Sequence, residues 1–307
     1  MKISTTLYFD RSTKMLGDVQ ANLSKTQEQL STGKQIVKPS DEPDKAALVT
    51  RLESEIARQT GYQDALKSVN IRLTAEETAL KNTTDVMFRI KELAMQAAND
   101  TLGTQDRQAV ALEMSALRDQ ILSLANSQDS NGNFLFSGSR AGEPAFSKDA
   151  TGRVMYQGDH ARMKVNVGDN RRMNLNLPGS DAFVRVVRED DKGNRVGVDF
   201  FQSLADLTDA VKSGDRTNMQ RGLKEIDTLQ NGVSEGLAQV GADLTVVDMQ
   251  NSVLDQIMLR LKTTRSDVED LDYTEAITRM NKDQLALEAA QSSFAKISQL
   301  SLFKYLS

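Results

Sequence analysis

Both ends of this chain carry apolar residues at the spacing of a helical seam, and this pattern constrains the fold more than any other feature. Near the amino end, they lie at Leu16, Val19, Leu23 and Leu30. Near the carboxyl end, they lie at Val233, Leu237, Val240, Leu244, Val247, Leu254, Met258, Leu261 and Val268. Such spacing places a narrow stripe on one side of a helix, which must be buried against another helix. We therefore expect the ends to pair, with each other or with other copies, as in an assembly protein rather than a catalyst.

The composition excludes several classes of function. The 307 residues include 43 acidic and 38 basic side chains, and the net charge of -5 gives no electrostatic reason to bind nucleic acid or an anionic membrane. Cys is absent, which excludes disulfides, thiolate metal ligands and a Cys nucleophile. Trp is absent and aromatic residues make up only 5% of the chain, which favours narrow helical bundles with aliphatic cores.

The sequence shows neither a membrane span nor a cleaved secretion signal. No apolar run approaches the ~18 residues of a membrane-spanning helix. The first ten residues, MKISTTLYFD, lack the apolar centre of a signal peptide. We expect a protein that is cytosolic or that leaves the cell by a route that does not read such a signal.

The helical pattern predicts two helices in the first hundred residues. The first helix runs over residues 12–32, and Gly33 can end it. Ser40 or Asp41 can cap the second helix, which places Pro43 in its first turn. The second helix extends over residues 44–99, about 80 Å at 1.5 Å per residue. Its predicted seam consists of Leu66, Val69, Leu73, Leu80, Met87, Ile90, Ala94 and Ala97.

A third helix and a change of period follow. Gly103 breaks the second helix and Thr104 can cap the third, whose stripe is Val110, Met114, Leu117, Ile121 and Leu124. Near Asn131-Gly132, a dipeptide typical of tight turns, the period changes from 3.6 to 2. Short alternating runs follow at Phe134–Phe136, Val154–Tyr156, Met163–Val167, Met173–Leu177 and Val196–Phe200. This pattern predicts a small antiparallel β domain.

The helical pattern returns near Phe201 and continues to the end of the chain. Gly214 ends a short helix, and Asp215 can cap the next one. A break is expected between Ser266 and Asp272, because Ser266–Glu269 and Asp272–Glu275 both fit capping boxes.

The predicted fold class is α+β: a long antiparallel helical bundle or coiled coil from both chain ends, with an inserted small antiparallel β domain. We expect the terminal helices to comprise residues 1–39 and 272–307. The helical bundle comprises residues 40–132 and 201–271, and the inserted β domain comprises residues 133–200.

Candidate chemical sites fail on their spacing. His160 is the only histidine, and a triad or a zinc site needs partners that it lacks, so we expect a surface position. Asp129, Asn131 and Asn133 resemble the start of a calcium loop. However, Phe134 stands where Gly is required, and Arg140 stands where a bidentate Glu is required.

The remaining candidates also favour structural roles. The acidic residues around the last helix break can be read as paired catalytic carboxylates or as helix caps, and their polar position favours caps. They are Asp267, Glu269, Asp270, Asp272 and Glu275. Gly138 and Gly142 lack the spacing of a phosphate-binding loop, and Arg171-Arg172 is too short for a nucleic-acid patch. We expect no catalytic residue, no cofactor and no metal.

Four segments, in order along the chain, resemble the bacterial flagellin family. Leu30-Ser-Thr-Gly-Lys34 precedes Lys38-Pro-Ser-Asp-Glu-Pro43, whose form is typical of hook–filament junction proteins rather than filament flagellin. Phe134-Leu-Phe-Ser-Gly-Ser139 resembles the strand that leads into the outer domain, and Tyr156-Gln-Gly-Asp159 resembles a tetrapeptide of the distal junction members. The run from Ser266 to Leu306 is similar to the family's closing helix. The motif residues are Pro39, Ser40, Asp41, Pro43, Phe134, Phe136, Ser137, Gly138, Tyr156, Gly158 and Asp159.

The resemblance implies a flagellin-like fold and a structural role as the distal of two adaptors between flagellar hook and filament. The implied partners are other copies in a ring of about eleven, the proximal junction protein, flagellin, and an export chaperone that binds the C-terminal helix. It also implies export without cleavage through the flagellar type III apparatus to an extracellular position, and binding to neither nucleic acid nor membrane. A filament flagellin and a cytosolic coiled-coil scaffold remain as alternatives.

The terminal segments are the predicted assembly interface. The first helix has about 20 residues, near the limit for an isolated helix, and Thr26 interrupts its apolar stripe. Our hypothesis is that residues 1–39 and 272–307 are mobile in the monomer and fold on assembly. The predicted interface residues are Ile3, Leu7, Leu16, Val19, Leu23, Leu30, Ile277, Met280, Leu287, Phe294, Ile297 and Leu302.

Four glycines lie within helical pattern, at Gly222, Gly232, Gly236 and Gly241. Each costs about 1 kcal/mol relative to Ala. Two interpretations stay open: close packing of helices, or a modest stability that eases unfolding for export.

Overall fold

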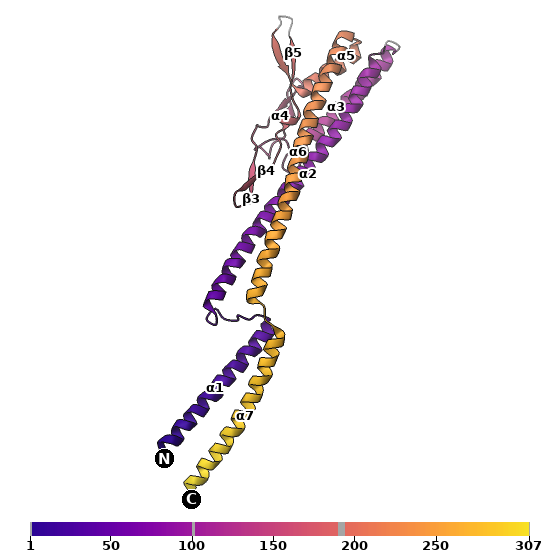
Figure 1. The fold of residues 1–307 in the computed structure, drawn as a ribbon. Coiled ribbons are helices and arrows are strands. Elements are labelled where there is room, and N and C mark those ends of the chain that lie inside the picture. The colour runs from indigo at the N-terminus through magenta and orange to yellow at the C-terminus, as the bar shows by residue number, and fades with distance from the viewer. Residues whose placement is uncertain (1, 100–101, 190–193, 307) are drawn as a thin grey trace. The chain divides into compact units, whose positions relative to one another are not determined.

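The computed structural model describes residues 2–99, 102–189 and 194–306, most of them in long helices (Figure 1). Before the insertion lie α1 (Lys2–Thr32), α2 (Pro43–Ala97) and α3 (Thr104–Ala125). After it lie α5 (Phe200–Ser213), α6 (Arg216–Glu269) and α7 (Tyr273–Leu306). The insertion comprises β1 (Phe146–Lys148), β2 (Val154–Tyr156), β3 (Lys164–Gly168), β4 (Arg171–Asn174), α4 (Gly179–Ala182), β5 (Val186–Glu189) and β6 (Arg195–Val198). This order confirms the predicted fold class.

The chain forms two compact units, and the long helices α2 and α6 contribute to both. One unit combines Met1–Gln59 with Gln256–Ser307 and contains α1 and α7. The other is Thr60–Asp255 and contains α3, α5 and the β insertion. The three-part division expected from the sequence stays a prediction.

Buried stripes on α2 and α6 form much of the core of the unit Thr60–Asp255. All eight residues of the predicted α2 seam are buried. On α6, Val233, Val240, Val247 and Leu254 are buried, and the intervening Leu237 and Leu244 pack against the same core. The apolar spacing therefore predicted this core correctly.

The ends of the shorter helices follow the sequence signals in part. Gly214 adopts a left-handed conformation (φ 76°) at the end of α5, and Asp215 Oδ1 accepts a hydrogen bond from the Asn218 N–H (3.1 Å) at the start of α6. Both were predicted. The prediction that Thr104 caps α3 is wrong, because Gly103 occupies the N-cap position and Thr104 is the first helical residue.

The insertion consists of three separate antiparallel hairpins, β1–β2, β3–β4 and β5–β6, among the described residues. The alternation predicted β2 correctly and β3, β4 and β6 approximately, but β1 and β5 were missed. The predicted strand at Phe134–Phe136 is wrong. Phe134 forms only an isolated bridge with Gln128, because the Arg72 side chain takes up the carbonyls of Phe134 and Leu135 that a partner strand would need.

Phenylalanine rings pack the insertion against α5. Phe146 meets Phe201 with ring centroids 5.1 Å apart, and Phe136 meets Phe183 at 5.6 Å and 86°, an edge-to-face arrangement. These rings are at most 5% exposed. Edge-to-face pairs add to the free energy of burial, so this cluster is the apolar centre of the insertion.

The structure supports close packing for three of the four helical glycines. A Cβ at Gly222 would lie 2.7 Å from Leu207 Cδ1 of α5, and one at Gly232 would lie 2.5 Å from Val184 Cγ2. At Gly236, a Cβ would lie 3.0 Å from Ala182 Cβ. Gly241 has nothing within 4 Å of such a Cβ, so close packing does not explain that residue.

In the unit that contains both termini, α1 begins at Lys2, earlier than the predicted Ser12. Within the added part of α1, the rings of Phe9 and of Phe294 on α7 are 4.8 Å apart. The sequence pattern of α1 alone does not reveal this partner. Gly33 ends α1 as predicted, with φ +70° and its N–H bonded to the Gln29 carbonyl (2.8 Å).

The break between α6 and α7 lies where the sequence predicted it. Asp272 Oδ1 accepts hydrogen bonds from the backbone N–H groups of Thr274 (2.9 Å) and Glu275 (3.1 Å), so this residue caps α7. The predicted capping box at Ser266 is wrong. Ser266 lies inside α6, and its hydroxyl bonds to the Asp270 carboxylate instead.

Candidate assembly surfaces

The α1–α7 pair carries the residues predicted for assembly (Figure 1). Leu7 and Ile277 remain 52% and 46% exposed. The side chains of Ile3, Ile297 and Leu302 lie outside the described part of the structure. The rest are partly buried in the monomer: Leu16, Val19, Leu23, Leu30, Met280, Leu287 and Phe294. A pair of helices thus covers part of each stripe and leaves apolar surface uncovered.

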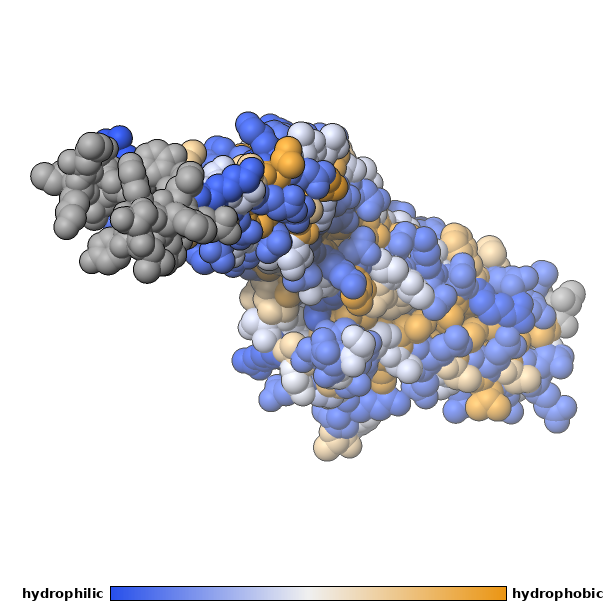
Figure 2. All heavy atoms as spheres, turned by 90° about the horizontal axis from the view of Figure 1, so that it is seen from below, coloured by the Kyte–Doolittle hydropathy of each residue, from blue (hydrophilic) through white to orange (hydrophobic). Residues whose placement is uncertain are grey.

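Further apolar side chains are exposed on the same two helices. Met15 is 66% exposed and Leu285 is 69% exposed, although both occur in helices with apolar stripes. Figure 2 shows hydrophobic side chains as separate patches within a largely hydrophilic surface. Single exposed apolar side chains are common on proteins, and Met15 and Leu285 join the candidate surface because they lie on the two helices that carry the predicted stripes.

The first family motif forms the loop between α1 and α2. Lys25 Nζ on α1 pairs with Asp41 Oδ1 (3.3 Å), and Lys38 Nζ pairs with Glu28 Oε2 (3.6 Å), so two ion pairs hold the loop against α1. Pro39 and Ser40 lie between these contacts, and Pro43 is the first residue of α2.

The predicted cap of α2 is wrong. Asp41 Oδ2 accepts a hydrogen bond from the Lys38 N–H (3.4 Å), within the loop. The Glu42 carbonyl accepts the first helical bond, from the Ala46 N–H (2.9 Å), so Glu42 precedes the helix. Neither Ser40 nor Asp41 reaches the amides of the first turn in the bonds that the structure shows.

Two family motifs, twenty residues apart, meet in the folded insertion. The Tyr156 hydroxyl lies 3.0 Å from the Phe136 carbonyl and 2.8 Å from the Asp159 carbonyl. The Ser137 carbonyl accepts a bond from the Asp159 N–H (3.2 Å). A Cβ at Gly158 would lie 2.6 Å from the Tyr156 ring, so only glycine fits there. The motifs form one interlocked turn.

Gly138 and Asp159 close this turn. Gly138 has φ +71°, which favours glycine, and a Cβ there would collide with the Asp159 carboxylate. Asp159 Oδ1 accepts bonds from the N–H groups of Ser139 (2.8 Å) and Ala161 (3.0 Å). The Ser139 hydroxyl and these amides lower the pKa of Asp159 to about 2, so the carboxylate is ionised at neutral pH.

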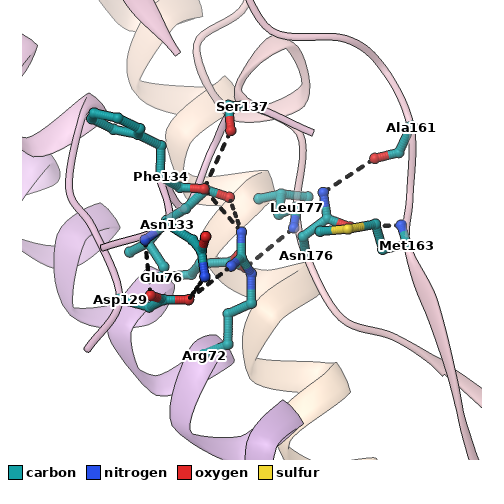
Figure 3. Close-up of polar contacts among 11 residues, drawn as sticks. Arg72, Glu76, Asp129, Asn133, Phe134, Ser137, Ala161, Met163, Asn176 and Leu177 are labelled. Atoms are coloured by element: carbon teal, nitrogen blue, oxygen red, sulfur yellow. Dashed lines mark hydrogen bonds and ion pairs between the residues drawn. The ribbon is translucent and has the colours of Figure 1, made fainter. Parts of the chain in front are cut away.

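A buried arginine connects α2 to the start of the insertion (Figure 3). Arg72 is 6% exposed, and its Nη2 donates to the carbonyls of Phe134 (3.0 Å) and Leu135 (2.9 Å). Its Nη1 lies 3.3 Å from Asp129 Oδ2. Asp129 Oδ1 in turn accepts bonds from the N–H groups of Asn131 and Asn133, which closes the turn that the sequence compared with a calcium loop.

Glu76, one turn after Arg72, binds a different part of the insertion, between β4 and α4. It is fully buried, and its Oε2 accepts a bond from the Leu177 N–H (3.2 Å), while Oε1 lies 3.5 Å from Arg72 Nε. Burial raises the pKa of Glu76 to about 8, although Arg72 and the Leu177 amide act in the opposite direction. Figure 3 shows Arg72 and Glu76 side by side, with bonds to separate parts of the insertion.

A second charged cluster anchors the β5–β6 hairpin. Arg188 on β5 makes a two-pronged contact with Glu225 on α6, with Nε and Nη2 at 2.6 and 2.7 Å from its oxygens. Asp206 on α5 also pairs with Arg188, and the Ser203 hydroxyl donates to Glu225 Oε2 (2.6 Å). Burial pushes the pKa of Glu225 upward, but Arg188 and Ser203 outweigh it, and the pKa is lowered.

The residues considered as chemical sites make hydrogen bonds and ion pairs with neighbouring residues. His160 is exposed, and its Nδ1 lies 2.7 Å from Ser180 Oγ. Of the acidic residues at the helix break, Asp272 caps α7 and Glu269 pairs with Lys34. Across residues 2–99, 102–189 and 194–306, no group of three or more His, Asp or Glu side chains could hold a metal ion. None of the described helices is long and apolar enough to cross a membrane.

Sequence reasoning missed both charged anchors of the insertion. Arg72, Glu76 and Arg188 occur among many charged residues, and charge alone does not distinguish a buried pair from a solvated one. For the first pair, one signal was available. Arg72 and Glu76 lie on the apolar side of α2, next to Leu73 and Leu80 of its seam, where a charged side chain must find a buried partner.

The comparisons with known proteins agree with this architecture. The sequence model described as the bacterial flagellin N-terminal helical region matches residues 3–141, and that for the C-terminal helical region matches residues 223–306. The chain belongs to the bacterial flagellin family, and its helix–insertion–helix order is that of a structural protein of the flagellum.

Within the family, the chain is similar to flagellar hook-associated protein 3. The protein of that name from Escherichia coli (strain K12) is 29% identical over 323 residues, which cover 99% of both chains. The crystal structure of FlgL from Xanthomonas campestris matches with a TM-score of 0.63 at 24% identity, over 70% of this chain and 99% of that one. Hook-associated protein 3 from Legionella pneumophila matches with a TM-score of 0.65 at 16% identity, over 72% and 98%. The family and fold expected from the sequence are confirmed.

Proposed function

We propose that this chain is a structural adaptor of the bacterial flagellum that stands between the hook-side adaptor and the flagellin filament. The observation that supports this role most directly is the full-length similarity to hook-associated protein 3, with 99% of both chains aligned. The Pro39–Pro43 loop and the Tyr156–Asp159 turn agree with it, because their sequences resemble those of junction members more than those of filament flagellin.

The incompletely covered α1–α7 pair suggests how such an adaptor assembles. Its stripes are partly buried within one chain, and neighbouring copies in a ring of about eleven would cover the remainder. Each fully buried Leu or Ile contributes about 1.5–3 kcal/mol before ordering costs. The protein then acts by binding alone, without catalysis.

Export completes the proposal. The chain passes unfolded and uncleaved through the flagellar type III apparatus, and a chaperone holds its C-terminal helix beforehand. The absence of Cys fits this route, since no disulfide forms to block a narrow channel. The assembled protein is extracellular.

A deletion strain tests the junction role. Loss of the filament with an intact hook, and flagellin released into the medium, supports the proposal when a plasmid copy restores swimming. Normal filaments in the deletion strain contradict it. A seeded assembly assay separates the role from that of a filament flagellin, because a junction protein does not extend filaments indefinitely.

A further inference from the structure

Two helix breaks that are far apart in the sequence are joined by backbone hydrogen bonds. The Gln35 N–H donates to the Glu269 carbonyl (2.7 Å), and the Leu271 N–H donates to the Gly33 carbonyl (3.0 Å). Together they form an antiparallel bridge between Lys34 and Asp270. Since Gly33 follows α1 directly and Leu271 precedes the start of α7, the bridge ties the end of one terminal helix to the start of the other.

A buried carboxylate lies at this bridge. Glu269 is only 7% exposed, and it pairs with Lys34 Nζ and with Arg265 Nε, the latter at 3.5 Å. Arg265 lies one turn earlier on the same helix and stays near Glu269 wherever α1 lies. Lys34 lies just after α1, so its contact with Glu269 depends on the position of the end of α1. Because a buried carboxylate is stabilised by each cation that it contacts, the pair favours that position.

The side of α1 that faces the bridge is polar and tightly packed. Gln29 is 4% exposed, and its Nε2 donates to the Gln35 carbonyl (2.6 Å), so the last turn of α1 holds the loop that carries Lys34. A Cβ at Gly33 would lie 2.8 Å from the Tyr273 hydroxyl, at the first residue of α7. Because Gln29 and Gln35 belong to the same segment, this bond keeps Lys34 at a fixed place relative to the end of α1.

The apolar stripes alone do not fix how α1 and α7 align. Leu16, Leu23 and Leu30 are seven residues apart, and so are Met280, Leu287 and Phe294. A shift by seven residues, about 10 Å along a helix, brings apolar residues opposite apolar residues again. In helical pairs of this kind, buried polar groups select one register among such alternatives.

We propose that Lys34 and Glu269, with the backbone bridge around them, are positioning residues that set the register of α1 against α7. The register determines which apolar side chains the pair exposes together, such as Leu7, Met15 and Leu285. Only this consequence for neighbouring copies rests on the proposed function. The register itself is defined by contacts within one chain.

Cross-linking measures the register directly, because the native chain has no Cys. In the full-length protein, Phe9→Cys is combined with Phe294→Cys to report the native register, whose rings lie 4.8 Å apart. Phe9→Cys with Leu287→Cys reports a shift by seven residues. A short bis-maleimide is the cross-linker, and helicity is followed by circular dichroism.

Lys34→Ala is expected to lower the yield of the cross-link between positions 9 and 294 about fivefold or more. The yield of the cross-link between positions 9 and 287 is expected to rise, and the helicity is expected to stay the same. Lys34→Arg is expected to keep the native pattern. Lys45→Ala is the control and is expected to keep the native pattern, because it removes an exposed ion pair between Lys45 and Glu42 at the start of α2. Unchanged yields in Lys34→Ala overturn the proposal. So does a loss of both cross-links, which would mean that Lys34 holds the pair together without selecting its register. Neither result bears on the deletion strain that tests the junction role.

Discussion

At the scale of single residues, Glu76 links the stability of the protein to pH. Its pKa rises from 4.5 to about 8 on folding because the carboxyl is buried. Above pH 4.5 the unfolded chain releases this proton while the folded chain keeps it, so the free energy of unfolding falls with rising pH, by up to ~1.4 kcal/mol per unit. The fall ends near pH 8, where the folded state also ionises. Urea unfolding at pH 5, 6.5 and 8 measures it.

Two variants isolate the contribution of Glu76. Glu76→Gln removes the titrating group. The free energy of unfolding of this variant is therefore expected to rise relative to that of the native protein as the pH rises from 5 to 8. Glu77→Gln is the control, since the neighbouring Glu77 forms a more exposed ion pair with Lys81. The prediction fails when the two variants follow the same pH dependence.

Residue-scale packing gives opposite predictions for two glycines of the same helix. Gly232→Ala is expected to destabilise the fold by ~1–3 kcal/mol, because its Cβ would lie 2.5 Å from Val184 Cγ2 and the neighbouring backbone must shift. Gly241→Ala meets no atom within 4 Å and is expected to stabilise by ~0.5–1 kcal/mol, the helix propensity gained. Thermal unfolding of both variants compares them. Stabilisation by both would show that α6 and Val184 are not closely packed.

At the scale of helices and strands, Arg188 is the contact that fixes the β5–β6 hairpin to α5 and α6. Arg188→Ala leaves the buried Glu225 with the Ser203 hydroxyl and the more distant Arg221, 3.6 Å away, so a loss of ~3 kcal/mol is expected. Arg185→Ala removes an ion pair whose arginine side chain is 71% exposed, and it is expected to cost less than ~1 kcal/mol. Urea unfolding and limited proteolysis of the hairpin measure both. Equal losses of stability in the two variants would contradict the prediction that Arg188 is the contact that fixes the hairpin.

The same elements show what the sequence could and could not predict. The seams of α2 and α6 were readable because apolar spacing directly encodes one buried face. The strands β1 and β5 were not, since Phe-Ser-Lys has a single apolar residue and Val-Val-Arg-Glu does not alternate. The charged anchors were missed because their partners lie far away in the chain, with Arg72 meeting Asp129 and Arg188 meeting Glu225. Arg72 also explains why the strand predicted at Phe134–Phe136 does not form, because its side chain binds the carbonyls that a partner strand would need.

One prediction about a helix surface follows from Leu285. This side chain is 69% exposed in the monomer, so Leu285→Lys is expected to leave thermal unfolding unchanged. If neighbouring copies cover it, the same change buries a charge and abolishes filament attachment in cells. Gln284→Lys introduces the same charge one residue earlier on the helix. Normal swimming with Leu285→Lys would show that this side chain stays exposed in the assembly.

At the scale of the whole molecule, stability is expected to be distributed unevenly between the terminal helices and the unit Thr60–Asp255. In that unit, the α2 residues Leu66, Leu80 and Met87 are fully buried, whereas the predicted interface residues of α1 and α7 are partly buried or exposed where their side chains are described. A pair of helices that buries so little opens readily, and amides exchange according to the free energy of local opening. The hypothesis that the ends become ordered on assembly therefore predicts that amides of the terminal helices exchange faster in the monomer than amides of the α2 core.

Hydrogen exchange of the monomer tests this prediction. Amides of residues 2–32 and 273–306 are expected to exchange at least about a hundredfold faster than those around Leu80 and Met87 in α2, a difference of ~3 kcal/mol in opening free energy. The register set by Lys34 is compatible with fast exchange, since a weak pair can still have one preferred alignment. Lys34→Ala serves as an internal comparison, because it should accelerate exchange near Gly33 and leave the α2 core unchanged. Slow exchange at both ends would mean that each copy is already complete before it meets its neighbours, and the covering of the stripes could not then drive assembly.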